Sequence, residues 1–321
     1  MVTDLFDSSA VPIDLPEEDP AIGYILQSFK EADPYGERAA WVFRNTFDQL
    51  YDGQRTGRYK WDQLFKTEKT HYGTLIEINL RREFNDILED GQILDYTVGP
   101  HEIDCKYSFR FGGWMLPPEC FGQLLLVCTA NDEASEWAMG IVRASQANRR
   151  PGVNRDGKSG LSKSGVKDIR WLQWGAELPP NVLLQINEEV RIQILSGRSG
   201  QERIVRLFRT VTNQRIGRNT IATVAQQDDY MKRVRANGGA RSTLAREGFI
   251  IPGGDYESHK RIAAALGAVV PRSGEFVSLR LVPSDDTFPN VVEIDGRLWR
   301  IGDADEWDGT PAPTLPSVSR L

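Results

Sequence analysis

Two kinds of hydrophobic periodicity distinguish the segments in the first half of the chain. Apolar residues recur at three- and four-residue spacings in residues 22–29 and 41–50, which predicts amphipathic helices. Residues 74–84 also have the pattern of a helix. Over residues 93–142 the pattern changes to short alternating or continuous apolar runs, which predict strands. The sequence therefore predicts an α/β domain with a mixed sheet over residues 21–173.

The predicted sheet begins with a hairpin. Residues 93–98 and 101–108 read as two short strands, and the Gly-Pro pair between them predicts a turn. Because successive side chains of a strand point to opposite faces, Asp104 and Lys106 share one face. The continuous apolar run at residues 123–128 predicts a buried strand next to this hairpin.

The second half of the chain has short helical patterns followed by strand patterns. Helical spacing is present in residues 202–212, and shorter helices are predicted at 219–225 and 230–235. A helix, a short turn and a basic helix in this order are typical of a helix-turn-helix. Apolar runs at residues 277–282 and 291–301 supply strands for a wing. The pattern therefore predicts a winged helix-turn-helix domain.

Changes in composition divide the chain into five predicted segments. The first 20 residues carry six acidic residues and no basic residue, which is typical of a loose leader. Pro-Pro and Gly interrupt the regular patterns shortly before residue 182, where we place a linker. The predicted segments are an acidic leader (1–20), the mixed-sheet domain (21–173), the linker (174–181), the winged helix-turn-helix domain (182–310) and a flexible tail (311–321).

The distribution of charge indicates a polyanionic partner. The 321-residue chain has a formal net charge of −6, but residues 190–246 contain eleven arginines and one lysine against three acidic residues. A local excess of arginine is what a phosphate-binding face requires, although a solvated helical surface is the alternative. No apolar run approaches membrane-spanning length, and the N-terminus lacks the basic start and apolar core of a secretory signal. We therefore expect a cytoplasmic protein without a membrane partner.

The first domain places acidic and basic side chains where they can meet. Asp95 lies on the first strand of the hairpin, and Asp104 and Lys106 lie on the second. Glu77 lies on the preceding predicted helix. Carboxylates bind a hard cation such as Mg²⁺, and a neighbouring lysine stabilises charge on a phosphate. This order of acid, acid and Asp-x-Lys matches PD-(D/E)xK nucleases, although Leu94 stands where that motif has proline. We therefore expect Glu77, Asp95 and Asp104 to hold Mg²⁺ and to act with Lys106 in catalysis.

Candidate DNA contacts lie in the basic loop of residues 144–168 and in the second domain. In the predicted helix of residues 230–235, Met231 and Val234 would face the core and the basic side chains would face a major groove. The candidates are Arg149, Arg150 and Lys163 in the loop, and Arg218, Gln226, Gln227, Lys232, Arg233, Arg235 and Arg241 in the second domain.

Several stretches resemble the NaeI family of type II restriction endonucleases. The similarity extends in order from about residue 33 to about residue 282 and covers both domains, which makes it far more specific than any single motif. The stretches are residues 50–59 (LYDGQRTGRY), 61–64 (WDQL), 66–71 (KTEKTH), 77–80 (EINL), 104–106 (DCK), 114–119 (WMLPPE), 221–229 (IATVAQQDD), 231–235 (MKRVR) and 238–242 (GGARS).

This resemblance implies a bacterial site-specific deoxyribonuclease that works as a homodimer. Its endonuclease and winged-helix domains would each bind double-stranded DNA, one copy as substrate and a second as activator, and a cognate DNA methyltransferase would accompany it. The acidic residues of the family's active site fall on Glu77, Asp95 and Asp104, and its lysine falls on Lys106. The best-known member cuts the palindrome GCCGGC, which is the site expected here.

Two other interpretations stay open from the sequence. A DNA-binding regulator could keep the nuclease domain only as a scaffold, although a scaffold has no need to place costly charges together. A topoisomerase or ligase relative is the other, since residues 50–55 resemble the Lys-x-Asp-Gly-x-Arg motif of DNA ligases. The lysine of that motif takes up a nucleotidyl group, which the side chain of Leu50 cannot do.

Overall fold

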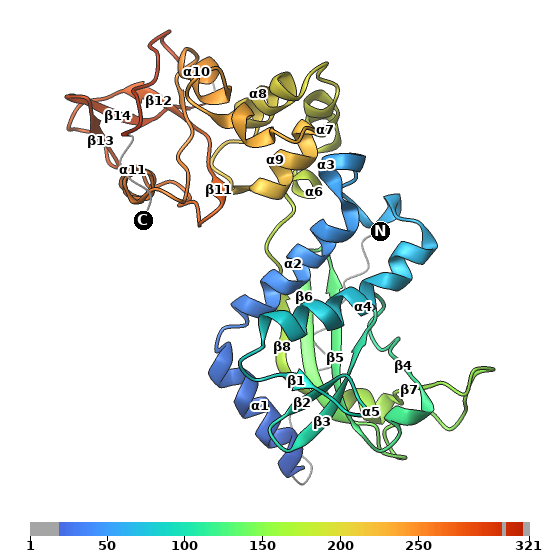
Figure 1. Ribbon diagram of the computed structural model, residues 1–321. Helices are drawn as coiled ribbons and strands as arrows, with labels where there is room; N and C mark the ends of the chain where they lie inside the picture. The colour runs from blue at the N-terminus through green and yellow to red at the C-terminus, as the bar shows by residue number, and fades with distance from the viewer. Residues whose placement is uncertain (1–18, 304–305, 317–321) are drawn as a thin grey trace. The chain divides into compact units, whose positions relative to one another are not determined.

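The computed structural model describes residues 19–303 and 306–316, and within them the chain forms two compact units (Figure 1). The first unit contains the described residues up to Leu50 together with Lys60–Pro180. The second contains Tyr51–Tyr59 and the described residues from Asn181 onward. The acidic leader predicted over residues 1–20 lies outside the described residues except for its last two. In the part of the chain that is described, no helix is long and apolar enough to cross a membrane.

A six-stranded mixed sheet forms the centre of the first unit (Figure 1). The strand order is β1-β2-β3-β5-β6-β8, with β3 and β5 parallel and the other neighbours antiparallel. The predicted buried strand is present as β5 and the predicted hairpin as β2–β3, but its first strand begins only at Tyr96, so Asp95 precedes the strand instead of lying on it. The strands are β1 (Glu89–Asp90), β2 (Tyr96–Val98), β3 (His101–Tyr107), β5 (Leu124–Asn131), β6 (Glu136–Arg143) and β8 (Arg170–Glu177), with β4 (Met115–Leu116) and β7 (Ser159–Gly160) as a separate pair.

Both faces of this sheet are covered, so every residue of β5 is buried. Leu125 and Val127 point into a core cluster that includes Trp114. The opposite face carries the helices, where Phe43 of α2 packs on Trp137 of β6 at a ring distance of 5.1 Å. The helices of this unit are α1 (Pro20–Ala32), α2 (Glu37–Tyr51), η2 (Trp61–Gln63), α4 (Lys66–Glu83), η3 (Pro118–Cys120) and α5 (Lys163–Lys167).

The apolar spacing in the predicted helices matches the faces that the helices bury. Helix α1 buries Ile25 and Phe29, and α4 buries Tyr72, Ile76 and Leu80 at four-residue intervals. The predicted linker differs from the structure, because β8 extends through Glu177 and pairs with β6. Proline and glycine signals in the sequence therefore placed the linker too early.

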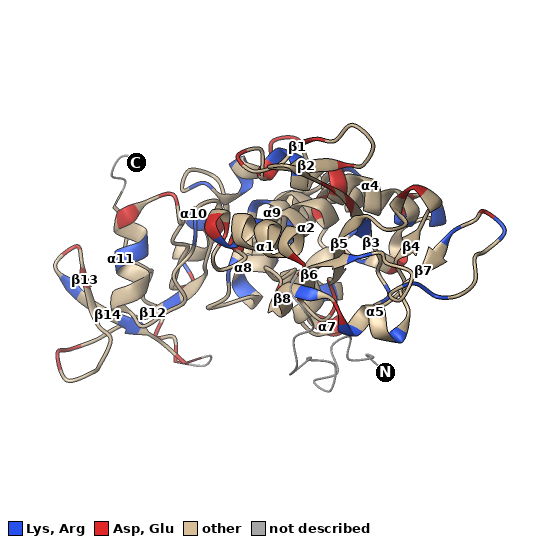
Figure 2. Ribbon diagram, turned by 90° about the horizontal axis from the view of Figure 1, so that it is seen from below, with Lys and Arg blue, Asp and Glu red and all other residues tan. Residues whose placement is uncertain are grey.

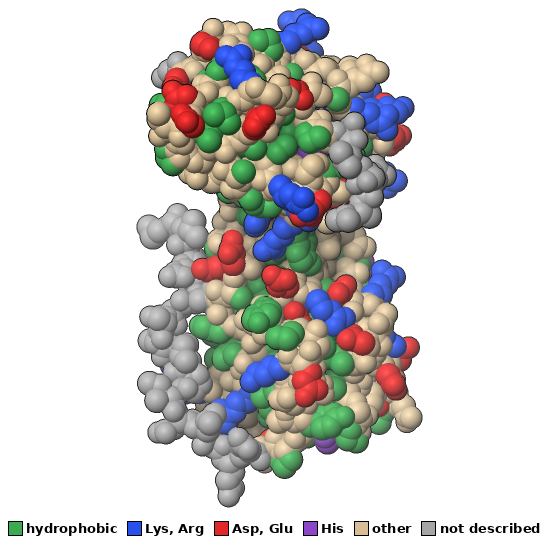
Figure 3. Space-filling model, turned by 90° about the vertical axis from the view of Figure 1, so that its left-hand side faces the viewer, with side chains coloured by type: hydrophobic (Ala, Val, Ile, Leu, Met, Phe, Trp, Pro, Cys, Tyr) green, Lys and Arg blue, Asp and Glu red, His purple; other side chains and the backbone are tan. Residues whose placement is uncertain are grey.

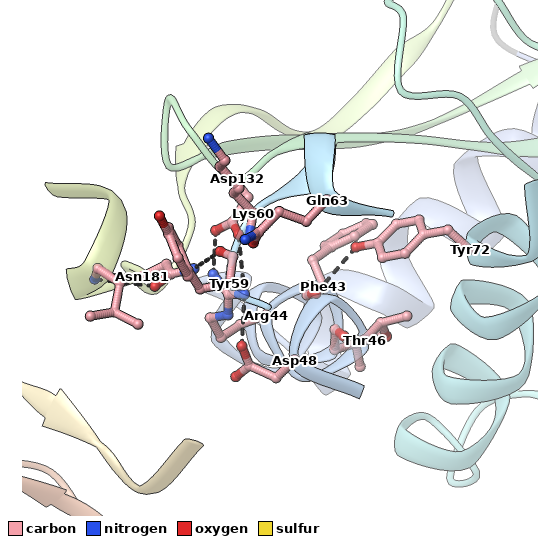
Figure 4. Close-up of polar contacts among 12 residues, drawn as sticks. Phe43, Arg44, Thr46, Asp48, Tyr59, Lys60, Gln63, Tyr72, Asp132 and Asn181 are labelled. Carbon is pink, nitrogen blue, oxygen red and sulfur yellow. Dashed lines mark hydrogen bonds and ion pairs between the residues drawn. The ribbon is translucent and has the colours of Figure 1, made fainter. Parts of the chain in front are cut away.

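A buried ion pair joins α2 to the turn that follows β5 (Figure 4). The Arg44 guanidinium contacts both carboxylate oxygens of Asp132, and its Nη2 also donates to Asp48 Oδ1 at 2.8 Å. The Arg44 and Asp132 side chains are only 4% and 2% exposed. The Tyr72 hydroxyl donates to the Phe43 carbonyl at 3.2 Å, which joins α4 to α2. These polar contacts thus fix α2 to the sheet and fix α4, the helix that carries Glu77, to α2.

The second unit combines short helices with a four-stranded sheet of order β10-β12-β14-β13 (Figure 1). Gly53 of α3 packs so closely on α9 that an added Cβ would lie 2.0 Å from Thr223 Oγ1. The helices are α3 (Gly53–Thr56), α6 (Val182–Gln185), α7 (Glu188–Leu195), α8 (Gly200–Thr210), α9 (Arg218–Ala225), η4 (Tyr230–Val234), α10 (Ala240–Ala245) and α11 (Glu257–Ala265). The strands are β9 (Ile216–Gly217), β10 (Phe249–Ile250), β11 (Glu275–Phe276), β12 (Leu279–Pro283), β13 (Val292–Ile294) and β14 (Arg297–Ile301), with β9 paired to β11.

The segment predicted as a basic helix has a different conformation. Residues 230–235 hold the short 3₁₀ helix η4, in which the Lys232 amide bonds to the Asp229 carbonyl, so the prediction of a regular helix is wrong there. Gly238 then adopts φ +76°, and a regular helix begins only at Ala240. Apolar spacing over six residues did not distinguish the two helix types.

The predicted flexible tail also differs in its described part, residues 311–316. The Ala312 amide donates to the Ala245 carbonyl at 2.7 Å, and Ala312 and Leu315 pack against the apolar core around Ile262 and Trp299. Residues 317–321 of the predicted tail lie outside the described part.

Replacing Arg44 with Met should destabilise the first unit by about 3–5 kcal/mol, because a buried carboxylate then loses the positive charge beside it. The matched control is Arg81→Met, which removes an ion pair to an Asp90 side chain that is 85% exposed and should cost less than about 1 kcal/mol. Guanidinium chloride unfolding followed by circular dichroism measures both. Equal effects of the two substitutions would contradict the role given to the buried pair.

Candidate active site and nucleic-acid interface

The hairpin and the neighbouring helix α4 bring the predicted acidic residues together. The Asp95 side chain precedes β2, and its Oδ2 accepts a hydrogen bond of 2.7 Å from the Cys105 amide on β3. Asp104 lies on β3 opposite Leu125 of β5, and its side chain is 4% exposed. The antiparallel pairing of Tyr96 with Ile103 sets this register. The strand pairing itself therefore places two carboxylates at one position on the sheet.

The Lys106 ammonium lies between these two carboxylates. Its Nζ contacts Asp104 Oδ2 directly, lies 3.8 Å from Asp95 Oδ2 and donates to the Cys105 carbonyl at 3.1 Å. Asp104 and Lys106 share a face of β3 because they are two residues apart. The predicted convergence of two carboxylates and one amine is therefore present in the structure.

Glu77 joins the cluster from α4. It lies one position beyond the buried Ile76, so it is at the edge of the face that packs on the sheet. The Tyr96 hydroxyl donates to the Glu77 carbonyl at 2.6 Å, which ties this turn of the helix to β2. Lys106 and Asp104 both act electrostatically on the Glu77 carboxylate.

Burial and like charge change the ionisation of the cluster. Burial, reinforced by the charge of Asp104, raises the pKa of Asp95 to about 7. Burial also raises the pKa of Glu77. Burial by itself would lower the pKa of Lys106, but the hydrogen bond and charge of Asp104 outweigh it, and the pKa is raised. The cluster thus holds more acidic groups than one ammonium can balance.

The chemistry of this donor set fits a hard divalent cation. Carboxylate oxygens from Glu77, Asp95 and Asp104 are the ligand type that Mg²⁺ prefers. Among the described residues, no group of three or more His, Cys, Asp or Glu side chains is already arranged to hold a metal ion. In the structure the charge beside Asp95 and Asp104 is supplied by Lys106.

One residue in contact with the cluster had not been predicted. The Cys120 thiol donates to Asp104 Oδ2 at 2.8 Å and is fully buried. Burial raises the pKa of this thiol well above its ordinary value, so it stays protonated near neutral pH. No signal in the sequence pointed to this contact, because the 16-residue separation between Cys120 and Asp104 carries no periodicity.

Only some of the residues predicted to contact DNA in the basic loop of the first unit are exposed to solvent. Arg150 and Lys163 are exposed, although the Arg150 Nε donates to the Leu161 carbonyl at 3.0 Å. The Arg149 guanidinium packs over the Phe121 ring at 3.8 Å. Figure 2 shows further basic residues on the loop that leads to β7.

The residues of the second unit that were predicted to contact DNA fall into two groups. Lys232, Arg235 and Gln226 are exposed, although the Lys232 Nζ lies 3.7 Å from Asp229 Oδ2. The other four bond more closely to the protein or are partly buried: Arg218 is exposed but pairs with Asp255, Arg233 pairs with Asp229, the Arg241 Nε donates to the Ile251 carbonyl, and Gln227 is half-buried. Figure 3 shows acidic, basic and hydrophobic side chains interspersed on the face that it draws.

The raised pKa of Asp95 predicts a specific pH dependence of stability. Because the folded-state pKa of about 7 exceeds the ordinary 3.8, this group favours folding most below pH 4, and the contribution is lost as the pH rises toward 7. Asp95→Asn should therefore raise the melting temperature at pH 8 in a metal chelator but change it little at pH 4. The exposed Asp90→Asn is the control. An Asp95→Asn difference from wild type that is the same at both pH values would contradict this assignment.

Comparison with known proteins agrees with the resemblance noted in the sequence. A family model described as restriction endonuclease NaeI matches residues 24–308. The type II restriction enzyme NaeI of Lentzea aerocolonigenes is 44% identical over 319 residues, which cover 97% of this chain and 98% of that protein. The match spans both units. The chain therefore belongs to the NaeI family of restriction endonucleases.

Proposed function

We propose that this chain is a Mg²⁺-dependent type II restriction endonuclease that hydrolyses double-stranded DNA at the palindrome GCCGGC. Family membership makes it a site-specific deoxyribonuclease. The observation that carries the mechanism is the position of Lys106 beside the carboxylates of Asp95 and Asp104. The recognition sequence rests on the family alone, because base readout depends on side chains placed against DNA.

Each residue of the cluster has a role in this proposal. Glu77, Asp95 and Asp104 would hold Mg²⁺, which when bound polarises the scissile phosphate and lowers the pKa of a water molecule. Lys106 stabilises the negative charge that develops on the phosphate, because its ammonium is already held at the carboxylates by the fold. The Cys105 amide keeps the Asp95 carboxylate turned toward this position.

The arrangement supports assignment of the first unit to the PD-(D/E)xK type. An acidic residue on helix α4 is followed by one beside β2 and by Asp-x-Lys on β3. Strand β5 pairs in parallel with β3, the strand that carries Asp104 and Lys106. The covered sheet supplies a rigid base for the charged residues.

We assign the second unit as a winged helix-turn-helix that binds a second, activating copy of DNA. Its order of α8, α9 and α10 followed by β10 and β12 supports this assignment. Two-fold symmetry of the palindrome favours a homodimer. A cognate DNA methyltransferase would protect the host's own sites, and both proteins would act in the cytoplasm.

Plasmid digestion tests this function. Purified protein is incubated with plasmids that contain or lack GCCGGC, with and without Mg²⁺. Discrete fragments only from the first plasmid and only with Mg²⁺ are expected. Fragments from both plasmids would contradict the recognition sequence, and cleavage without a divalent ion would contradict the metal dependence.

Replacing Lys106 with Ala should lower the cleavage rate by about 100-fold or more, because a preorganised positive charge at the phosphate is lost. Gel-shift affinity for a GCCGGC duplex in chelator should stay close to that of wild type. Lys30→Ala, an exposed lysine on α1, is the control and should cleave normally. Cleavage by the Lys106 variant at the normal rate would show that its role is wrongly assigned.

The exposed basic residues of the second unit predict a change in salt dependence. A Lys232→Gln and Arg235→Gln double variant should reduce the slope of log affinity against log salt by about 2, because two phosphate contacts are lost. The control is Arg261→Gln with Arg297→Gln, which removes two exposed charges from α11 and β14. Fluorescence anisotropy with duplex DNA in chelator measures both. An equal change in both variants would mean that the affected charge is diffuse rather than located at η4.

A further inference from the structure

Two donors hold the Asp104 carboxylate through one oxygen. The Lys106 ammonium and the Cys120 thiol both contact Oδ2, with the thiol donating at 2.8 Å. Among the described residues, no donor bonds to Oδ1. We propose that Cys120 is a positioning residue of the nuclease site, whose thiol fixes Asp104 so that Oδ1 is presented to the divalent cation. This inference rests on the proposed function.

The fold gives the thiol a fixed position. Cys120 ends the 3₁₀ helix η3, where its amide donates to the Pro117 carbonyl and its carbonyl accepts from the Gln123 amide, both at 3.0 Å. Its side chain is buried in the cluster with Trp114 and Leu125. Since Leu125 is the β5 partner of Asp104, the chain that carries the thiol is anchored to the same strand pair as the carboxylate.

The Cys120 thiol and the Lys106 ammonium would have different roles at Asp104 Oδ2. Lys106 is a charged side chain whose proposed role is at the phosphate. While the Lys106 ammonium, held at Asp104, also acts on the phosphate, the Cys120 thiol donates its one hydrogen to Oδ2 alone. A neutral donor orients the carboxylate without cancelling the charge that attracts a cation. Loss of the thiol should therefore weaken the response to Mg²⁺ rather than the binding of DNA.

Two substitutions separate this role from simple packing. Cys120→Ala removes the donor, whereas Cys120→Ser keeps a hydroxyl donor in nearly the same volume. Cys128→Ala is the matched control. It likewise removes a buried thiol, but Cys128 lies on β5 and has no contact with Asp104. Cleavage rate is measured against Mg²⁺ concentration for each variant, together with DNA affinity in chelator and the melting temperature.

The half-saturating Mg²⁺ concentration of Cys120→Ala should rise about 10-fold, as for other residues that orient a metal-binding group. Cys120→Ser should return most of the way to wild type, and Cys128→Ala should match wild type. DNA affinity in chelator should be the same for all four proteins. The serine rescue is the readout that a role in packing alone would not produce.

Three results would overturn the inference: a normal Mg²⁺ response of Cys120→Ala, no rescue by serine, or an equal shift in Cys128→Ala. Failure of the proposed function is distinguished by wild type and Asp104→Asn. If wild type needs no divalent ion, or if Asp104→Asn cleaves normally, the proposed function is wrong and the inference falls with it. If both behave as expected and Cys120→Ala still responds normally to Mg²⁺, only the role of the thiol is wrong.

Discussion

The burial of carboxylates next to one another on a covered sheet is the constraint on which the first unit depends. Asp104 is almost fully buried, and the pKa of Asp95 is raised because ionisation there is opposed by burial and by its neighbour. The Lys106 ammonium, the Cys105 amide and the Cys120 thiol offset this cost. Each of these donors comes from β3 or from the segment that leads into β5, so the site requires the parallel pairing of these two strands.

The same constraint recurs at the other end of β5. Asp104 pairs near the start of that strand and Asp132 follows its last residue, so the two buried carboxylates are separated by about 20 Å of extended chain. Asp132 is balanced by Arg44 of α2, which packs on the sheet through Phe43. Both ends of the central strand therefore depend on a long basic side chain. At Asp132 the ion pair with Arg44 is buried and joins α2 to the sheet. At Asp104 the basic residue is held on the same strand, where part of its side chain remains accessible.

Local periodicity predicted the parts of the site that lie on single elements. Two-residue spacing placed Asp104 and Lys106 on one face, and the helical pattern placed Glu77 on the helix that precedes the hairpin. Cys120 and the pair of Arg44 with Asp132 could not be predicted in this way, because their contacts depend on strand order and on helix packing over long separations. The extent of β8 was missed for a related reason: its pairing with β6 is a tertiary interaction that overrides the local turn signals near residue 175.

The count of charged residues overestimated how many basic side chains of the second unit are available to bind a polyanion. Residues 190–246 carry a strong excess of arginine, but Arg218, Arg233 and Arg241 bond to groups of the protein itself. The guanidinium forks of these residues hold loops and short helices together, which is a use of arginine that needs no ligand. The basic excess is therefore partly structural, and a DNA-binding role of η4 has to rest on side chains that remain exposed, Lys232 and Arg235 above all. Placement rather than composition decides how much of such an excess is available to phosphate groups.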